Sequence, residues 1–186
     1  IPYGELTAVN GEWVKAPGHA LFSAVRDAFE GNLPIIAEDL GIITPEVEAL
    51  RDEFGFPGMK VLQFAFHSLP HRYTSPVCVC YTGTHDNDTT RSWYQTLRPE
   101  CRDKVRRYTH CSNDTHFPLD LIGTALASVA AYAIFPLQDV LCVGAEGRMN
   151  TPGIGAGNWS WRYQQSALKD ELADELRGMT ILYGRY

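Results

Sequence analysis

Short, unbroken apolar runs separate longer segments in which apolar residues recur at helical spacing. Runs of this kind are typical of strands that are buried on both faces, as in parallel sheets covered by helices. They predict strands over residues 33–37, 59–66 and 77–81, and a last strand region over 134–143 that Pro136 interrupts. The pattern therefore indicates an α/β fold.

The segments between these runs predict helices. Their apolar residues return every three or four positions, and several segments open with a capping threonine or an early proline or close with glycine. The predicted helices cover residues 19–31, 45–54, 89–94, 100–108, 117–133 and 164–177. Residues 67–76 and 147–157 are polar or rich in glycine, and we expect them to be loops. Strands that alternate with helices in this way are typical of β/α units.

Two of the predicted strands end in acidic residues. The first is followed by Glu38 and Asp39, and the other by His85 and Asp86. Burying an unpaired carboxylate in a core is costly, whereas the carboxyl ends of barrel strands are where catalytic groups lie. Glu38 and Asp86 are 48 residues apart with one complete strand between them, so both can reach one pocket. Asp39 could instead cap the turn that follows it.

Convergent carboxylates suit glycoside chemistry, in which a proton donor and charged groups surround a sugar that becomes positively charged. Asn150 and Asn158 flank the glycine-rich loop, where their amides could bind sugar hydroxyls or simply form turns. The cluster at 85–88 has the residue types of a metal site. Adjacent residues at a strand end point in different directions, so we expect no bound metal there.

Eight blocks of residues resemble, in the same order, the 4-alpha-glucanotransferases of the amylomaltase or disproportionating-enzyme type, which are related to the alpha-amylase clan. They include IIAEDLG at 35–41, TGTHDNDT at 82–89 and GNWSWR at 157–162, and the others lie at 7–11, 13–18, 57–66, 136–139 and 148–153. The resemblance implies transfer of alpha-1,4-glucan segments to glucose or another glucan by a retaining double displacement. It also implies maltooligosaccharides and alpha-1,4-glucans as binding partners and calls for no cofactor.

The resemblance assigns roles to four side chains. Glu38 matches the family's general acid/base, and Asp86 matches the acid that stabilises the transition state by binding sugar hydroxyls. His85 matches a residue that helps to hold that sugar, and Phe64 an aromatic that lines the glucan groove. The nucleophilic aspartate of the family lies upstream of these blocks. We therefore expect residues 1–186 to be the C-terminal portion of a single (β/α)8 barrel, incomplete in this chain and inactive alone.

One position departs from the family's pattern. The family usually has a glycine directly before the tryptophan that is Trp93 here, whereas this chain has Ser92. A helix start tolerates serine well, so we expect a local change in packing and no loss of activity.

Charge and cysteine content narrow the possible partners. The net charge of −6 argues against nucleic acid or an anionic membrane as a partner. No apolar run approaches the roughly 20 residues of a membrane span. The five cysteines are odd in number and form no C-x-x-C pair, which favours reduced thiols and a cytoplasmic location.

Two alternative functions remain open. An alpha-glucan hydrolase of the same clan would use the same acids with water as the acceptor. A non-catalytic glucan-binding protein belongs to a different class, and it should have lost Glu38 or Asp86, both of which are present.

Overall fold

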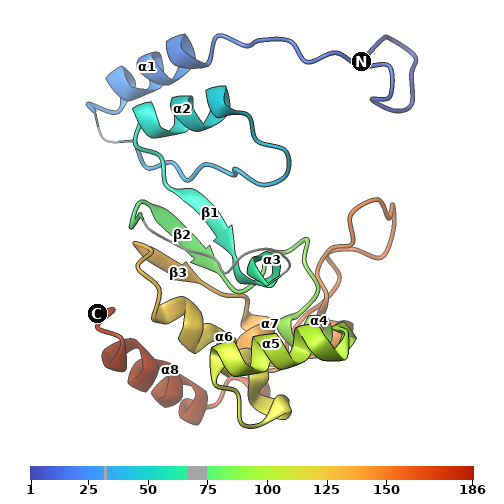
Figure 1. Cartoon of the computed structure of the whole chain (residues 1–186), viewed down its shortest axis with the longest axis vertical. Coiled ribbons are helices and arrows are strands. Elements are labelled where there is room, and N and C mark those ends of the chain that lie inside the picture. Colours follow the sequence, from blue (N-terminus) through green and yellow to red (C-terminus); the bar gives the residue numbers. More distant parts are fainter. Residues whose placement is uncertain (32, 67–74) are drawn as a thin grey trace.

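A sheet of three short parallel strands lies at the centre of the molecule (Figure 1). In this computed structural model, which describes residues 1–31, 33–66 and 75–186, the strands are β1 (Gly58–Val61), β2 (Cys78–Tyr81) and β3 (Tyr132–Ile134). They lie in the order β1-β2-β3, and Met59 pairs with Val79, which pairs in turn with Tyr132. Parallel neighbours need crossover connections, and helices provide the one between β2 and β3. The α/β class is confirmed.

Most helices gather at one end of the sheet (Figure 1). They are α3 (Leu62–Ala65), α4 (Thr90–Thr96), α5 (Pro99–Thr109), α6 (Phe117–Leu126), α7 (Leu137–Val140) and α8 (Asp170–Leu182), with short 3-10 turns η1 (Asp114–His116), η2 (Ala145–Gly147) and η3 (Gln165–Ala167). The main core joins these helices to β2, since Cys78 and Cys80 are buried with Leu121. The rings of Tyr94 and Phe117 stack there at 3.8 Å.

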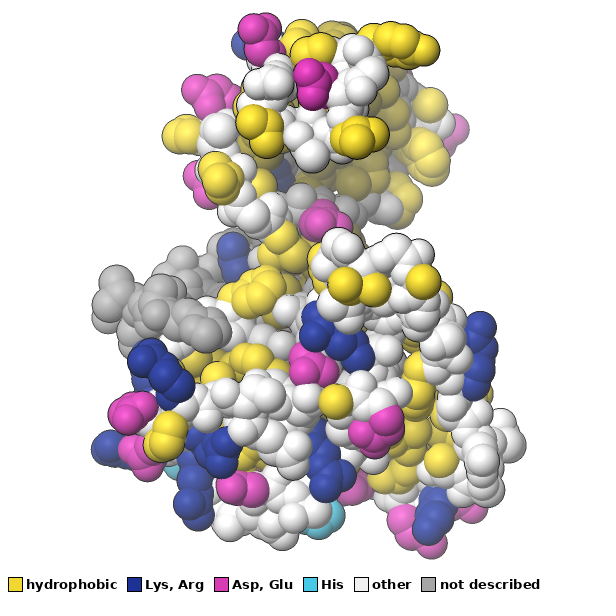
Figure 2. All heavy atoms as spheres, turned by 90° about the vertical axis from the view of Figure 1, so that its right-hand side faces the viewer, with side chains coloured by type: hydrophobic (Ala, Val, Ile, Leu, Met, Phe, Trp, Pro, Cys, Tyr) yellow, Lys and Arg dark blue, Asp and Glu magenta, His cyan; other side chains and the backbone are white. Residues whose placement is uncertain are grey.

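A separate helix pair, α1 (Gly18–Ala28) and α2 (Pro45–Glu53), lies at the other end of the sheet. The ring of Phe22 packs 5.6 Å from that of Phe54 and 4.9 Å from that of Phe56. Figure 2 shows a narrow waist between this pair and the rest of the chain, with hydrophobic side chains exposed near it. Residues 1–17 contain no helix or strand and are mostly exposed.

The predicted strand over residues 33–37 is wrong, because this segment runs beside the start of β1 without joining the sheet. The N–H of Ala37 donates to the carbonyl of Pro57 at 2.9 Å. Pro34 has no N–H with which to continue such a ladder. Of the two acidic residues that follow, Asp39 is instead held by contacts of its side chain with Arg51 and with the N–H of Met59.

The predicted strand over 59–66 is too long. It ends at Val61, and one turn of helix, α3, follows. Leu62 and Phe66 are both buried in the main core. Their spacing of four residues places them on one face of a helix. The apolar run therefore changes from strand to helix at its midpoint.

Boundaries near the C-terminus also differ from the predictions. The helix expected over 117–133 ends at Leu126. Arg185 donates to the carbonyls of Leu126 and Ser128 at 2.6 Å each, and these are carbonyls that the helix itself leaves without partners. The strand expected over 134–143 is instead the end of β3 followed by α7, with Pro136 at the helix N-cap. The closing helix, expected over 164–177, is α8 and lies further along the chain.

The predicted helices at 19–31, 45–54, 89–94 and 100–108 are confirmed as α1, α2, α4 and α5. Thr89 caps α4, since its hydroxyl accepts a hydrogen bond from the N–H of Ser92 at 3.3 Å. Most of the loop expected at 67–76 lies outside the described residues. Within the part of the chain that is described, no helix is long and apolar enough to cross a membrane.

Candidate active site

A cleft of about 750 Å³ brings together four of the six predicted site residues. Glu38 enters it from the segment beside β1, Phe64 from α3, and His85 and Asp86 from the segment that follows β2. Met59 and Tyr81 line the same cleft, as do residues 134–136, which are the last residue of β3 and the two that follow it. The cleft therefore lies at the carboxyl ends of parallel strands, where α/β folds place their reactive groups.

Asp86 is held by a second loop that follows α7. Its Oδ1 accepts a hydrogen bond from Nδ2 of Asn150 at 2.6 Å and lies 3.2 Å from Nε2 of His85. Nη2 of Arg148 donates to the carbonyl of Asp86 at 3.1 Å, and the N–H of Asn150 donates to that of His85 at 3.1 Å. Both the carboxylate and the backbone of Asp86 are thus fixed, while the side chain remains half exposed.

Glu38 and Asp39 play different parts although they are neighbours. Glu38 is exposed in the cleft, and it has no hydrogen-bond or ion-pair partner among residues 1–31, 33–66 and 75–186. The side chain of Asp39 is only 6% exposed, pairs with Nη1 of Arg51 in α2, and accepts a hydrogen bond from the N–H of Met59 at 2.6 Å. Asp39 therefore anchors the segment that presents Glu38, and its role is more than the turn cap considered above.

Gly58 and Arg51 pack closely around the side chain of Asp39. A Cβ at Gly58 would lie 2.3 Å from Oδ2 of Asp39, so only glycine permits this approach. Hydrogen bonding to Asp52 and to Asp39 raises the pKa of the Arg51 guanidinium, against the opposing effect of burial. The ion pair between Arg51 and Asp39 therefore keeps α2 attached to the start of β1.

Asp88 differs from Asp86 although only Asn87 separates them. Its Oδ1 accepts a hydrogen bond from the N–H of Thr89 at 2.8 Å, and its Oδ2 from the hydroxyl of Ser92 at 2.6 Å. Both partners belong to the start of α4. Asp88 is therefore a helix-end residue, and Ser92 adds a hydrogen bond that a glycine at this position would lack.

Asn158 is engaged by its own loop. Its Oδ1 accepts a hydrogen bond from the N–H of Thr151 at 3.0 Å, and its Nδ2 donates to the carbonyl of Ile154 at 2.8 Å. It does not line the cleft. These contacts favour the turn-forming alternative and make Asn158 the residue that closes the loop between 151 and 158.

Trp159 follows in a backbone conformation that bulky residues seldom adopt, with φ of 61°. Its N–H donates to the carbonyl of Met149 at 2.7 Å, and its ring lies 5.0 Å from that of His85. The side chain stays 54% exposed. Phe64, in α3, is similarly exposed at 52% and lines the cleft.

Sequence reasoning gave no role to Arg148 or Asp139. Arg148 links the two loops through the contacts to Asp86 and to the carbonyl of Asn150. Asp139 is a buried carboxylate at 1% exposure. The sequence does offer one indication for Asp139, since it is an acidic residue inside the apolar stretch at 134–143. Across the described segments, no group of three or more histidines, cysteines and acids could hold a metal ion.

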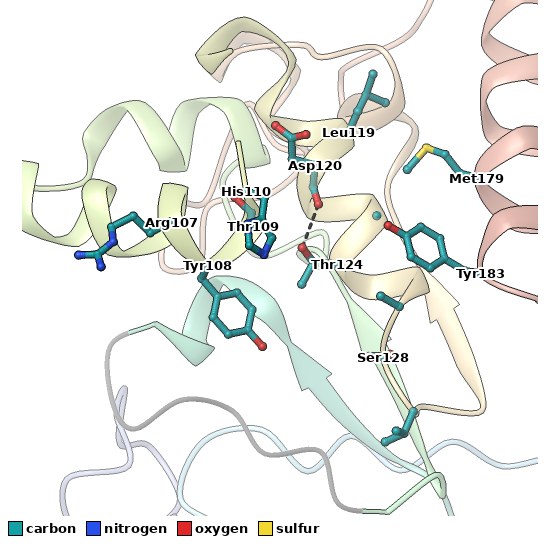
Figure 3. Close-up of a pocket in the computed structure, with 13 residues that line it drawn as sticks. Arg107, Tyr108, Thr109, His110, Leu119, Asp120, Thr124, Ser128, Met179 and Tyr183 are labelled. Carbon is teal, nitrogen blue, oxygen red and sulfur yellow. Dashed lines mark hydrogen bonds between the residues drawn. The ribbon is translucent and has the colours of Figure 1, made fainter. Parts of the chain in front are cut away.

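A larger cavity, of about 970 Å³, lies elsewhere, between α5, α6 and α8 (Figure 3). Tyr108 and Tyr183 border it, and Thr124 in its wall donates to the carbonyl of Asp120 at 2.9 Å. None of the predicted site residues lines it. The cleft at the strand ends is therefore the candidate active site because of the residues that line it, although its volume is smaller.

Comparison with known proteins shows similarity to one enzyme family. A profile of the family described as 4-alpha-glucanotransferase matches residues 1–168. The chain is 54% identical over 191 aligned residues to a 4-alpha-glucanotransferase of Synechocystis sp., and 49% identical over 191 to one of Thermus thermophilus; these alignments cover 100% and 96% of the chain. A chloroplastic or amyloplastic 4-alpha-glucanotransferase of Solanum tuberosum is 45% identical, again over the whole chain.

A solved structure is also similar. The amylomaltase from Streptococcus agalactiae in complex with acarbose superposes on 100% of the chain with a TM-score of 0.93 at 34% identity. The chain spans only 38% of that protein, and 38%, 38% and 33% of the three relatives above.

Proposed function

Because this chain belongs to the family of 4-alpha-glucanotransferases, glycoside hydrolase family 77, we propose that it forms part of an enzyme that transfers alpha-1,4-glucan segments to glucose or another glucan. The observation that carries this proposal is the shared cleft, in which Glu38, Phe64, His85 and Asp86 meet from three separate segments. Maltooligosaccharides and alpha-1,4-glucans are the substrates, and the chemistry needs no cofactor.

We further propose that residues 1–186 are the C-terminal portion of a single (β/α)8 catalytic barrel. The three strands are parallel and in sequential order, as in such a barrel, and the likeness to the amylomaltase covers this chain but 38% of that one. The nucleophilic aspartate then comes from an upstream segment. The five cysteines are all free, which fits a cytoplasmic enzyme.

In the proposed reaction, Glu38 first donates its proton to the oxygen of the departing sugar while the upstream aspartate attacks the anomeric carbon. A covalent glycosyl-enzyme forms with inversion. The hydroxyl of a second glucan then gives its proton to Glu38 and attacks the same carbon, which restores the original configuration. A retaining reaction needs the two carboxyl groups about 5–5.5 Å apart. The exposed position of Glu38 on the wall of the cleft allows such an approach.

Asp86 stabilises the transition state in this scheme. Its Oδ1 faces Asn150 and His85, so the other oxygen, Oδ2, remains to accept hydrogen bonds from sugar hydroxyls. Such hydrogen bonds strengthen as positive charge develops on the sugar ring. His85 and Asn150 hold the same sugar, and the half-exposed ring of Phe64 stacks on a sugar face. Asn158 contributes by shaping the loop.

Product analysis with maltotriose tests the reaction class on the full-length protein. Transfer yields glucose together with chains longer than maltotriose, whereas hydrolysis yields only shorter sugars. Glucose and maltose without any longer product would favour the hydrolase of the same clan. A protein that binds the sugar without changing it would instead be a glucan-binding protein.

A further inference from the structure

We propose that Asp139 is a positioning residue whose carboxylate holds both ends of the segment that carries His85 and Asp86. Its Oδ2 accepts hydrogen bonds from the hydroxyls of Thr82 at 2.6 Å and Thr90 at 2.7 Å, and its Oδ1 accepts one from the N–H of Thr90 at 2.9 Å. One carboxylate in α7 therefore joins the end of β2 to the start of α4.

The two threonines bracket the segment that the cleft uses. Thr82 and Thr90 are fully buried, and residues 83–89 lie between them. The segment is also supported from α3, because Nε2 of Gln63 donates to the carbonyl of Asp88 at 2.9 Å. Gly83 permits this support, since a Cβ there would lie 2.7 Å from the same nitrogen. With its ends and one internal point fixed, the segment can present Asp86 in a single orientation.

The energetics of Asp139 also favour a positioning role. The carboxylate is 1% exposed, and no cationic side chain forms an ion pair with it in the described part of the chain. Burial raises the pKa of Asp139, and hydrogen bonds from Thr82 and Thr90 act in the opposite direction. A buried charge of this kind adds little to stability compared with an apolar residue of similar size. What it provides is three directed hydrogen bonds to two places in the chain.

This inference rests on the proposed function only for the importance of Asp86. Loss of the carboxylate or of one threonine hydroxyl should let residues 83–89 move, and a displacement of about 1 Å at a reacting group can cost about 10²-fold in rate. Substrate affinity should fall less than turnover, because Asp86 acts mainly in the transition state.

The test compares four variants of the full-length enzyme. Thr82→Val and Asp139→Asn weaken the hydrogen-bonded set, while Thr82→Ser keeps the hydroxyl. Thr124→Val removes a threonine hydroxyl far from the cleft and serves as the matched control. Amide hydrogen exchange over 83–89 is measured by mass spectrometry, and kcat and KM are measured for disproportionation of maltotriose.

We expect Thr82→Val and Asp139→Asn to exchange faster over 83–89 and to lose about tenfold or more in kcat, with a smaller change in KM. Thr82→Ser and Thr124→Val should match the parent protein in both respects. Unchanged exchange over 83–89 in a folded Thr82→Val variant would overturn the inference. If the parent enzyme transferred no glucan, the proposed function would fail, while hydrogen exchange would still decide the role of Asp139. If Asp139→Asn did not fold, Thr82→Val and its serine control would decide alone.

Discussion

Replacing Asp86 and Asp88 one at a time with asparagine tests the proposal that one acid of this short segment is catalytic and the other structural. The two residues have the same side chain and lie two positions apart, so differences in expression or handling affect both alike. Asp86 faces the cleft and Asn150, whereas Asp88 faces Thr89 and Ser92 at the start of α4.

The contacts of each residue set the expected magnitudes. Asp88→Asn keeps one oxygen acceptor for the N–H of Thr89 but replaces the charged partner of the Ser92 hydroxyl with a neutral one. The difference between charged and neutral hydrogen bonds gives a loss of about 1 kcal/mol in the free energy of unfolding. Asp86 is half exposed, so Asp86→Asn should change stability by less. Its turnover should fall about 10²–10³-fold, the scale for losing one hydrogen-bonding group directed at a transition state.

The assay measures kcat for disproportionation of maltotriose and the melting temperature for both variants of the full-length protein. We expect Asp86→Asn to be nearly inactive with an unchanged melting temperature. Asp88→Asn should retain most of its activity and melt a few degrees lower. An inactive Asp88→Asn beside an active Asp86→Asn would refute the assignment of roles in this segment.

Three further predictions follow from individual contacts. Ser92→Gly, which introduces the residue expected from the resemblance, should cost about 2 kcal/mol of stability with activity kept, because it removes a hydrogen bond to Asp88 and places glycine in a helix. Chemical denaturation measures the free energy of unfolding, and unchanged stability would count against the contact. Trp159→Gly relieves the strain of a positive φ at an exposed residue, so the melting temperature should stay unchanged. Transfer should slow, because the ring that packs against His85 is lost. A large fall in melting temperature with full activity would show that the ring serves only packing. Because burial raises the pKa of Asp139, its contribution to stability is fully present below the ordinary pKa of an aspartate and is lost as pH rises through the raised pKa of the folded state. The stability of Asp139→Asn relative to the parent should therefore increase as pH rises above that ordinary value, and a difference that stays constant with pH would contradict the shift.

The local features of the fold could be predicted from sequence. Thr89 caps α4, and Cys78 and Cys80 pack in the core as their spacing on a strand suggests. The apolar run at 33–37 led to a wrong strand prediction, because an apolar pattern reports burial and does not show whether a neighbouring strand is available for pairing. Pro34 also lacks the N–H that a ladder of backbone hydrogen bonds needs. The run at 59–66 misled because Leu62 and Phe66 suit a strand and a helix equally well.

The candidate site was predictable only in part. Acids at the ends of apolar runs pointed to Glu38 and Asp86, and the structure places both in one cleft. The partners of these acids could not be inferred in the same way. Asp139 meets its threonines across 49 and 57 residues, and Asn150 meets Asp86 across 64. Such contacts depend on how the strands and helices pack, which no local pattern encodes.

Turnover of the Glu38→Gln variant of the full-length enzyme tests whether Glu38 is the general acid/base. Glutamine keeps the size and hydrogen bonding of glutamate but cannot exchange the proton. Transfer from maltotriose should therefore fall by about 10²–10⁴-fold, while the affinity for maltooligosaccharides, measured by calorimetry, stays within a few-fold of the parent. Transfer at a near-normal rate in Glu38→Gln would place the general acid/base at another residue.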